Sequence, residues 1–283
     1  MKKIIIDAHA KINLSLDVLK RREDGYHELE MIMQQIALKD VITIEERDAG
    51  FTIASNSKEI PLDQSNLVYK AYNVMAKKFN INKGIHIYIE KNIPVAGGLA
   101  GGSTDAAAVL KGLNTLWKLN LREDQLMDIG LKIGADVPYC IMGGTALAKG
   151  IGEKLTRLKS FSDRLILIAN PGLNISTADV YNNLKLEKIT DRPHTENMLK
   201  YIEKGDTELV AKEMKNVLEG VTIKENPILN KIKEQMISHG ALGSLMSGSG
   251  PTIFGIFSDS TDLAKCEENL KYSIKTVLST KTV

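Results

Sequence analysis

The sequence predicts an α+β protein, because strand-like and helix-like stretches mix without a regular β-α-β rhythm. Residues 12–18 alternate apolar and polar side chains, as a half-buried strand does, and residues 85–90 do the same. Between them, the apolar side chains of residues 66–79 recur at helical spacing. A doubly wound sheet, in which strands and helices alternate in order, is therefore disfavoured.

The other expected elements follow in the same mixed order. Ser103, Thr104 and Asp105 are small polar residues that can cap free N–H groups, so a helix is expected to start there and continue to Trp117. After Gly152 the pattern restarts. The remaining expectations are strands at 2–19, 41–45, 51–54, 165–169 and 252–257, and helices at about 207–218, at 227–239 and from about 261.

Length and composition limit the possible classes of protein. A chain of 283 residues suits two domains, which we place at 1–155 and 156–283. A hydrophobic content of 43% and a charged content of 25% are typical of a soluble globular protein. The net charge of +2 gives no support for a nucleic-acid partner, which usually requires a concentrated basic face.

The cysteines and the N-terminal segment indicate a cytoplasmic protein. Cys140 and Cys266 lie far apart and lack metal-ligand spacing, so neither a disulfide framework nor a zinc site is expected. The apolar run Ile4–Ile6 is too short for a signal peptide. No stretch is long and apolar enough to span a bilayer.

A glycine-rich stretch, Pro94–Thr104, lies between a predicted strand and a predicted helix. Its four glycines permit positive φ, so successive N–H groups can turn toward one anion, and the helix adds its own free N–H groups. The stretch therefore suits a di- or triphosphate. It has neither the Gly-Lys-Ser/Thr end of a P-loop nor the G-x-G-x-x-G spacing. A flexible linker or a tight strand-helix turn is the open alternative.

Two ionisable residues are candidates for catalysis. Asp136 lies between Gly134 and Pro138, so its carboxylate is expected at a turn, where it can take a proton from a hydroxyl or bind magnesium. Capping of that turn or of the next segment is the alternative. Lys11 lies in a predicted strand and can neutralise a phosphate or lower the pKa of a hydroxyl. A solvated strand lysine is the alternative.

Two further segments can contact a ligand. Tyr26 and His27 follow a turn glycine, and an aromatic ring beside an imidazole can stack on a heterocycle and hydrogen-bond it. A half-buried surface pair remains open. Ser247–Pro251 is a second small-residue loop that either approaches a ligand closely or serves only as a turn.

Three separated segments resemble, in sequence and in order, the three motifs of the GHMP kinases. They are Lys11–Leu14, Pro94–Thr104 with its helix, and Met246–Pro251, so the resemblance covers essentially the whole chain. The one small departure is Thr104, where a second serine is frequent in the family. The closest similarity is to the branch that acts on a cytidine-linked alcohol, and it rests on Ala10–Leu14, Asp24–Leu29, Gly97–Ala107 and Gly134–Pro138.

The resemblance implies a fold and a reaction. The fold is a ribosomal-S5-domain-2-like N-terminal domain that binds ATP and a ferredoxin-like C-terminal domain that contributes to the substrate site. The reaction is ATP-dependent phosphorylation of the C2 hydroxyl of a cytidine-diphosphate-linked methylerythritol, a step of the non-mevalonate route to isoprenoids, with Mg²⁺ as cofactor. The implied partner is this small molecule, with no nucleic acid or membrane, for a monomer or a homodimer.

The same resemblance assigns roles to individual residues. Asp136 is expected to be the catalytic base and to contact the substrate, and Lys11 to stabilise the attacking alkoxide. Asn13 is expected to position the erythritol end, while Tyr26, His27 and a second aromatic, Tyr181, hold the cytosine. The residues implied to bind ATP are Asn66, Lys91, Pro94, Val95, Ala96, Gly97, Gly98, Leu99, Ala100, Gly101, Gly102, Ser103, Thr104 and Asp105.

Two other functions stay open at this point. One is a different GHMP kinase, of the homoserine or mevalonate type, against which Gly25–His27 argues because those enzymes have no cytosine to hold. The other is a non-catalytic nucleotide-binding module, against which the presence of both Lys11 and Asp136 argues. The magnesium ligands and the oligomeric state are not predicted.

Overall fold

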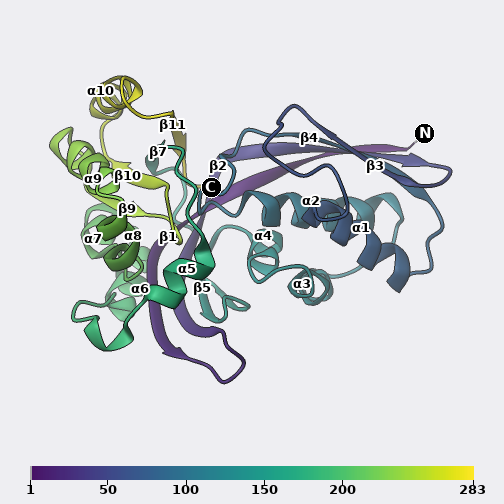
Figure 1. The fold of residues 1–283 in the computed structure, drawn as a ribbon, viewed down its shortest axis with the longest axis horizontal. Helices are drawn as coiled ribbons and strands as arrows, with labels where there is room; N and C mark the ends of the chain where they lie inside the picture. The colour runs from purple at the N-terminus through teal and green to yellow at the C-terminus, as the bar shows by residue number, and fades with distance from the viewer. Residues whose placement is uncertain (1) are drawn as a thin grey trace. The chain divides into compact units, whose positions relative to one another are not determined.

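The computed structural model describes residues 2–283 and confirms the α+β class (Figure 1). The strands are β1 Lys3–Arg21, β2 His27–Arg47, β3 Phe51–Ser55, β4 Gly84–Glu90, β5 Thr145–Gly150, β6 Lys154–Arg157, β7 Leu165–Asn170, β8 Lys215–Asn216, β9 Gly243–Met246, β10 Ile253–Phe257 and β11 Thr276–Lys281. The helices are α1 Leu67–Lys78, α2 Gly101–Leu116, α3 Glu123–Leu131, α4 Val137–Met142, α5 Thr177–Asn183, the 3-10 helix η1 Leu186–Lys188, α6 Thr195–Lys204, α7 Thr207–Glu213, α8 Glu219–Glu225, α9 Ile228–Ser238 and α10 Ser260–Lys271.

The fold divides into two compact units. Unit 1 contains the chain up to Ala10, Leu38–Val95 and Ala100–Gly143. Unit 2 contains Lys11–Ala37, Ala96–Leu99 and Gly144–Val283. Strands β1 and β2 are long enough to contribute residues to both units.

In unit 1, helices pack on a sheet in which β4 lies between β2 and β3 and pairs with both. Strand β4 pairs antiparallel with β2, where Val41 lies opposite Glu90, and parallel with β3, where Phe51 lies opposite Ile85. Helix α2 lies close against this sheet (Figure 1), because a Cβ on Gly112 would come within 2.5 Å of the side chain of Ile44. This packing places the N-terminus of α2 beside the strands.

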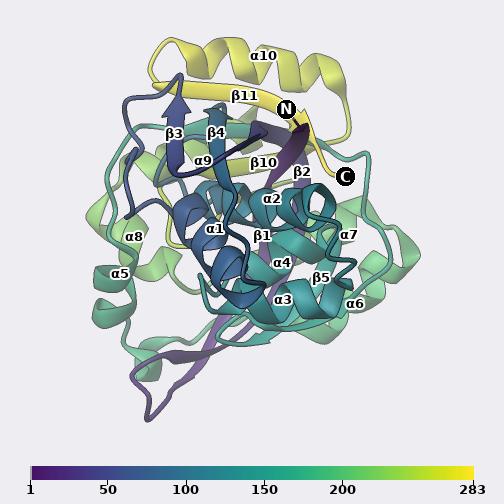
Figure 2. The same cartoon turned by 90° about the vertical axis from the view of Figure 1, so that its right-hand side faces the viewer.

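In unit 2, a four-stranded sheet has the order β11-β7-β10-β9. Its pairs are antiparallel, and the buried residues Ile166–Ala169 of β7 and Ile253–Phe257 of β10 supply its centre. Figure 2 shows α10 running along β11. Elsewhere in this unit, β5 pairs with both β2 and β6, and β8 pairs in parallel with β1.

The predicted start of the helix after the glycine-rich stretch is wrong. Helix α2 begins at Gly101, and its N-cap residue, Ala100, has a left-handed backbone with φ of 59° and makes no side-chain cap bond. The Thr104 hydroxyl donates instead to the carbonyl oxygen of His9 at 2.7 Å. The threonine therefore anchors α2 to β1, and the N–H groups of the first turn stay free of side-chain caps.

The predicted helix at 207–218 is also wrong beyond Glu213. Helix α7 ends there, and Lys215–Asn216 form β8, with Ser15 opposite Lys215 in the parallel strand β1. Val217 and Leu218, which also fell in the predicted helix, are buried outside any helix. Tertiary pairing thus overrides a local helical pattern. Strands β5, β6, β9 and β11, helices α3, α4, α5, α6 and α8, and the 3-10 helix η1 were not predicted.

Candidate active site

Lys11 and Asn13 lie on the part of β1 that belongs to unit 2. Lys11 is 5% exposed and Asn13 is fully buried. Ile12 and Leu14, on the opposite face of the strand, are fully buried as well, so β1 is covered on both sides. The solvated alternative for Lys11 is therefore wrong. Its ammonium donates to Asn13 Oδ1 at 2.8 Å, and its backbone N–H donates to the carbonyl oxygen of Leu99 at 3.2 Å.

Parts of the three motif segments meet in unit 2. The Ser247 hydroxyl donates to the carbonyl oxygen of Gly98 at 2.9 Å, and the Gly248 N–H donates to Asn13 Oδ1 at 3.1 Å. A Cβ on Gly98 would lie 2.2 Å from the carbonyl oxygen of Ser247, so no side chain fits at that position. The loop after β9 is thus more than a turn, since it contacts both the glycine-rich stretch and β1.

The glycine-rich stretch has an unusual backbone. Ala96, Gly98 and Ala100 have φ of 53°, 73° and 59°, so positive values alternate along the chain. A positive φ costs an alanine roughly 1–2 kcal/mol relative to ordinary conformations. Alternation of left-handed and other conformations turns neighbouring N–H groups toward one side, which is the geometry of an anion-binding concavity.

Ser103 and Thr104 are neighbours in the first turn of α2, but only one of their hydroxyls is free to bond a ligand. Thr104 is buried and its hydroxyl is bonded to His9. Ser103 is half-exposed, and its hydroxyl takes part in no hydrogen bond among residues 2–283. Of the two hydroxyls, that of Ser103 is free to bond a phosphate oxygen or a metal ion.

Asp136 immediately precedes α4 in unit 1 and is half-buried. It has a helical backbone, with φ of −81°, and its side chain makes no cap bond to α4. The alternative that Asp136 caps this helix is therefore wrong. Pro138, in the first turn of α4, fixes the backbone there without the loss of a helical hydrogen bond.

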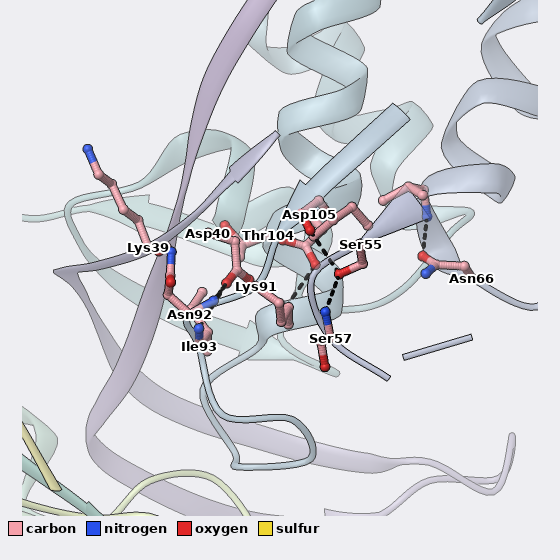
Figure 3. Close-up of polar contacts among 12 residues, drawn as sticks. Lys39, Asp40, Ser55, Ser57, Asn66, Lys91, Asn92, Ile93, Thr104 and Asp105 are labelled. Carbon is pink, nitrogen blue, oxygen red and sulfur yellow. Dashed lines mark hydrogen bonds and ion pairs between the residues drawn. The ribbon is translucent and has the colours of Figure 1, made fainter. Parts of the chain in front are cut away.

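Lys91 lies at the centre of a buried charge cluster in unit 1 (Figure 3). Its ammonium is 2.5 Å from Asp40 Oδ2 and 2.9 Å from Asp105 Oδ2. The other oxygen of Asp40 accepts the N–H groups of Asn92 and Ile93 at 2.6 and 2.8 Å. The other oxygen of Asp105 is buried and has no hydrogen-bond partner among the described residues.

The cluster holds two carboxylates against one ammonium, and the pKa values respond accordingly. Burial raises the pKa of Asp105 to about 7; Lys91 opposes this rise, and the neighbouring Asp40 adds to it. Burial acts to lower the pKa of Lys91, but the attraction of Asp105 and Asp40 outweighs it, so the net shift is upward. Lys91 is therefore charged at neutral pH, while Asp105 retains its proton to a higher pH than an exposed carboxyl does.

Asn66 is the N-cap residue of α1, where its Oδ1 accepts the N–H of Val68 at 3.0 Å. Its amide donates to the carbonyl oxygen of Pro61 at 2.7 Å. The side chain of Asn66 is thus used locally, as is that of Lys91. A contact of either side chain with a nucleotide remains a prediction.

Tyr26, His27 and Tyr181 all belong to unit 2. The rings of His27 and Tyr181, the latter on α5, lie 5.2 Å apart at an angle of 32°. Tyr26 is 60% exposed. Burial lowers the pKa of His27, and Arg21 adds to the effect, so the imidazole is neutral at pH 7 and can both donate and accept a hydrogen bond. These aromatic groups can stack on a heterocycle and read its polar edge.

Two residues with a part in these arrangements were not found from the sequence. Asp40 pairs with Lys91 although 51 residues separate them, and Asn216 holds the loop of Ser247 from the side of β8. Asp40 stands between strand residues with no motif around it, and Asn216 fell inside a predicted helix. Neither carries a local sequence signal.

The fold and these features define a small-molecule kinase of the GHMP class. The profile of the GHMP kinases N terminal domain matches residues 66–144, and that of the GHMP kinases C terminal domain matches residues 198–275. The chain belongs to the GHMP kinase family, with the two-domain GHMP kinase fold.

The more specific similarity is to one kind of GHMP kinase. The chain is 49% identical over 278 residues to the 4-diphosphocytidyl-2-C-methyl-D-erythritol kinase of Clostridium botulinum, with 98% of this chain and 99% of that protein covered. It is 50% identical over 283 residues to the kinase of the same name from Acetivibrio thermocellus, with 100% of both chains covered.

Solved structures agree with these sequence relatives. A crystal structure of 4-(cytidine 5'-diphospho)-2C-methyl-D-erythritol kinase superposes with a TM-score of 0.84 at 31% identity, covering 99% of each chain. A homoserine kinase from Cytophaga hutchinsonii superposes with a TM-score of 0.79 at 20% identity, covering 100% of this chain and 95% of the other. The second match speaks for the fold alone.

Among residues 2–283, no helix has the length and apolar character needed to cross a membrane. The same residues contain no group of three or more His, Cys, Asp or Glu side chains arranged to hold a metal ion.

Proposed function

We propose that this chain transfers the γ-phosphoryl group of ATP to the C2 hydroxyl of 4-diphosphocytidyl-2-C-methyl-D-erythritol, in the non-mevalonate route to isoprenoids. The observation that carries the proposal is the buried network of Lys11, Asn13, Gly98 and Ser247–Gly248 in unit 2, which joins parts of three kinase motifs. Full-length relatives at about half identity support this choice of alcohol.

In the proposed reaction, Asp136 takes the proton of the C2 hydroxyl. The resulting oxygen bonds to the γ-phosphorus, the bond from that phosphorus to the β,γ-bridging oxygen breaks, and ADP leaves with the bonding electrons. Lys11 stabilises the charge that develops on the attacking oxygen. Its burial beside a neutral amide suits this task, because no carboxylate within unit 2 is ion-paired with its ammonium.

The phosphates of ATP are proposed to lie on the glycine-rich stretch, Gly97–Thr104, and at the N-terminus of α2. The alternating positive φ values and the uncapped N–H groups of the first turn both favour an anion. The Ser103 hydroxyl is the available side-chain donor. Asn66 and Lys91 are proposed to lie near the adenine and ribose.

Magnesium fits this arrangement as an ion that arrives with the nucleotide. Mg²⁺ in kinases usually keeps waters and binds one or two protein oxygens together with substrate phosphates, so it needs no dedicated carboxylate cage. The Ser103 hydroxyl is the protein oxygen that the first turn of α2 leaves free. When bound, the ion neutralises charge on the phosphates.

The alcohol substrate is proposed to bind through unit 2. Tyr26, His27 and Tyr181 would hold the cytosine by stacking and hydrogen bonding. Asn13 would position the erythritol end through Nδ2. Among residues 2–283 this group donates only to the Met31 sulfur, at 3.3 Å, a weak acceptor that a substrate hydroxyl can replace at little cost.

The domain boundary and the cellular setting are also proposals. We propose an ATP-binding domain at 1–155 and a domain at 156–283 that contributes to the substrate site. We further propose a cytoplasmic protein, monomeric or homodimeric, that acts on a small molecule and binds neither nucleic acid nor membrane.

The proposed function is tested by ADP formation with the cytidine-diphosphate methylerythritol, set against mevalonate and homoserine. Turnover with the first substrate alone is expected. Asp136→Asn should lower kcat at least about a hundredfold with little change in ATP affinity, because the proton acceptor is lost while the phosphate site remains. Preference for homoserine or mevalonate would replace the proposed substrate, and ATP binding without turnover on any alcohol would indicate a binding module.

The cytosine contact is tested by Tyr26→Ala. The loss of a stacking face should raise KM for the cytidine substrate roughly tenfold and leave KM for ATP within about twofold. Tyr272→Ala, which removes another exposed tyrosine on a different part of unit 2, is the control. Equal increases in both KM values would argue against this role of Tyr26.

A further inference from the structure

The two-residue strand β8 brings Asn216 beside β1. Leu16 lies opposite Asn216 in the parallel pair, and the Val217 N–H donates to the carbonyl oxygen of Leu16 at 3.0 Å. Asn216 is only 3% exposed. A buried amide that lacked partners would destabilise the fold, so its contacts indicate what it is there to hold.

The side chain of Asn216 makes three hydrogen bonds. Its Nδ2 donates to the carbonyl oxygen of Met246 at 2.8 Å and to that of Gly248 at 2.7 Å. Its Oδ1 accepts the Leu218 N–H at 3.0 Å. Both amide protons are therefore used to hold the two carbonyl groups that lie on either side of the Ser247–Gly248 peptide unit.

The network continues from this loop to Lys11. The Gly248 N–H donates to Asn13 Oδ1, which also accepts from the Lys11 ammonium at 2.8 Å. Gly248 has a φ of 57°, and a Cβ there would lie 3.7 Å from Lys11 Nζ. The orientation of the Ser247–Gly248 peptide unit, which carries this N–H, thus decides where Asn13 Oδ1, and with it the ammonium, is held.

A second side chain next to β8 holds the same loop. Glu219, at the start of α8, accepts the Met246 N–H through Oε1 at 2.8 Å and pairs through Oε2 with Lys233 at 2.6 Å. Asn216 and Glu219 thus bind the carbonyl and the N–H of Met246. The segment before Ser247 is thus fixed by side chains other than Asn13.

We propose that Asn216 is a positioning residue for phosphoryl transfer, which orients Lys11 through Gly248 and Asn13. The inference rests on the proposed function. Asn216 touches neither substrate nor Lys11 in this scheme, and its effect on the reaction passes through the Ser247–Gly248 peptide unit, whose two neighbouring carbonyl groups it holds. Removal of its two donors should let that peptide unit rotate and release Asn13 Oδ1 from its fixed place.

The test compares Asn216→Ala and the isosteric Asn216→Asp with a control, Asn226→Ala. Asn226 lies at the C-terminal end of α8, and its amide donates to the carbonyl oxygen of Thr222. Both changes at 216 should lower kcat roughly tenfold or more while KM for ATP stays within about twofold, since a catalytic group is displaced and the phosphate site is not. Asn226→Ala should keep normal kcat. Unchanged kcat at 216, or equal losses in all three variants at matched thermal stability, would overturn the proposal.

A double-mutant cycle separates positioning from general support of the fold. If Asn216 acts through Asn13, the combination of Asn13→Ala and Asn216→Ala should lower kcat no more than the worse single change. Independent structural roles would instead multiply the two losses, and that outcome would overturn the proposal.

Hydrogen exchange tests the coupling between Asn216 and the loop independently of the proposed substrate. Asn216→Ala should speed amide exchange in Met246–Gly250 and leave α1 unchanged. If the unsubstituted protein turns over none of the tested alcohols but the exchange result holds, the proposed function fails and the coupling stands. If exchange in the loop does not change, the coupling itself fails.

Discussion

Each unit of the protein buries a lysine, and the two lysines are compensated in opposite ways. In unit 1, Lys91 lies between the carboxylates of Asp40 and Asp105. In unit 2, Lys11 donates to the neutral amide of Asn13 and takes part in no ion pair recorded among the described residues of that unit. The charge of Lys91 is balanced by carboxylates in contact with it, whereas no described carboxylate of unit 2 balances the charge of Lys11.

This difference predicts that Lys91 supports the fold and that Lys11 takes part in the reaction. A buried charge with partners that satisfy it tolerates burial, and removal of one partner is strongly destabilising. A buried charge with only a neutral partner carries a desolvation cost that a functional site can retain, because the unbalanced charge attracts an anion. Lys11 and Lys91 are both predicted site residues, but the chemistry of their partners leads us to expect different effects when each is replaced.

The largest expected effect is on stability, from Lys91→Met. The change leaves Asp40 buried without its cation, so the free energy of unfolding of unit 1 should fall by about 3–5 kcal/mol. Trp117, the single tryptophan of the chain, lies in unit 1, so urea unfolding followed by its fluorescence reports on this unit.

The matched control for Lys91 is Lys39→Met in the same unit. Lys39 pairs with Asp7, and both side chains are more than two-fifths exposed. Removal of such a pair should cost about 0–1 kcal/mol. Equal losses for the two lysines would break the distinction between a cancelled buried charge and a surface pair.

The next effect is on activity, from Lys11→Met. Loss of the uncompensated ammonium should lower kcat by about a hundredfold or more, because it removes the charge proposed to face the developing alkoxide. The stability of unit 2 should hold or rise, since a desolvated charge is replaced by an apolar side chain of similar length. Steady-state kinetics and thermal unfolding by circular dichroism measure the two quantities.

Asn13→Asp sharpens this second prediction without removing the lysine. It places a carboxylate against Lys11 and so imitates the situation of Lys91. The ion pair should lower kcat roughly tenfold, because the ammonium is neutralised in place. Full activity in Asn13→Asp would mean that the free charge of Lys11 is not what the site uses.

Periodicity found β1 and α1 because their burial repeats along the chain, but it found only residues 41–45 of the long strand β2. In α1 the structure buries Ala71 and Met75 of the predicted apolar face. Strand β8 could not be found in this way, because two residues, Lys215–Asn216, show no period and become a strand only through pairing with Ser15 and Leu16.

The residues of the candidate site likewise divide into those that carry a local sequence signal and those that do not. Lys11, Asp136 and the glycine-rich stretch carry local signals, namely a charge in a strand, a carboxylate at a turn and a run of glycines. The burial of Lys11 and the cap-free carboxylate of Asp136 needed the structure. Asp40 and Asn216 have roles that consist of partners far away in sequence, so a single sequence holds no trace of them.

The smallest expected effect is a pH dependence of the stability of unit 1. Burial raises the pKa of Asp105 to about 7, far above the 3.8 of an exposed carboxyl. Between these values the folded protein binds a proton that the unfolded chain has released, so this contribution to the free energy of unfolding is full below the lower pKa and is lost as pH rises through the upper one. The ionised carboxylate faces Asp40 as well as Lys91, which is why the proton is retained.

Asp105→Asn should therefore lose less stability than the unsubstituted protein between about pH 5 and about pH 8, because an amide supplies a donor toward Asp40 at every pH. The measurement is urea unfolding followed by Trp117 fluorescence at both pH values. Asp124→Asn, an exposed carboxylate whose pKa Arg122 lowers, is the control and should keep the original pH dependence. Since every other ionisable group of unit 1 is shared by the unsubstituted protein and Asp105→Asn, the difference between their slopes isolates Asp105. Identical slopes in all three proteins would mean that Asp40 and Asp105 are both ionised across this pH range. Lys91 would then be in contact with two full negative charges, and the difference from Lys11, which has none in unit 2, would be greater.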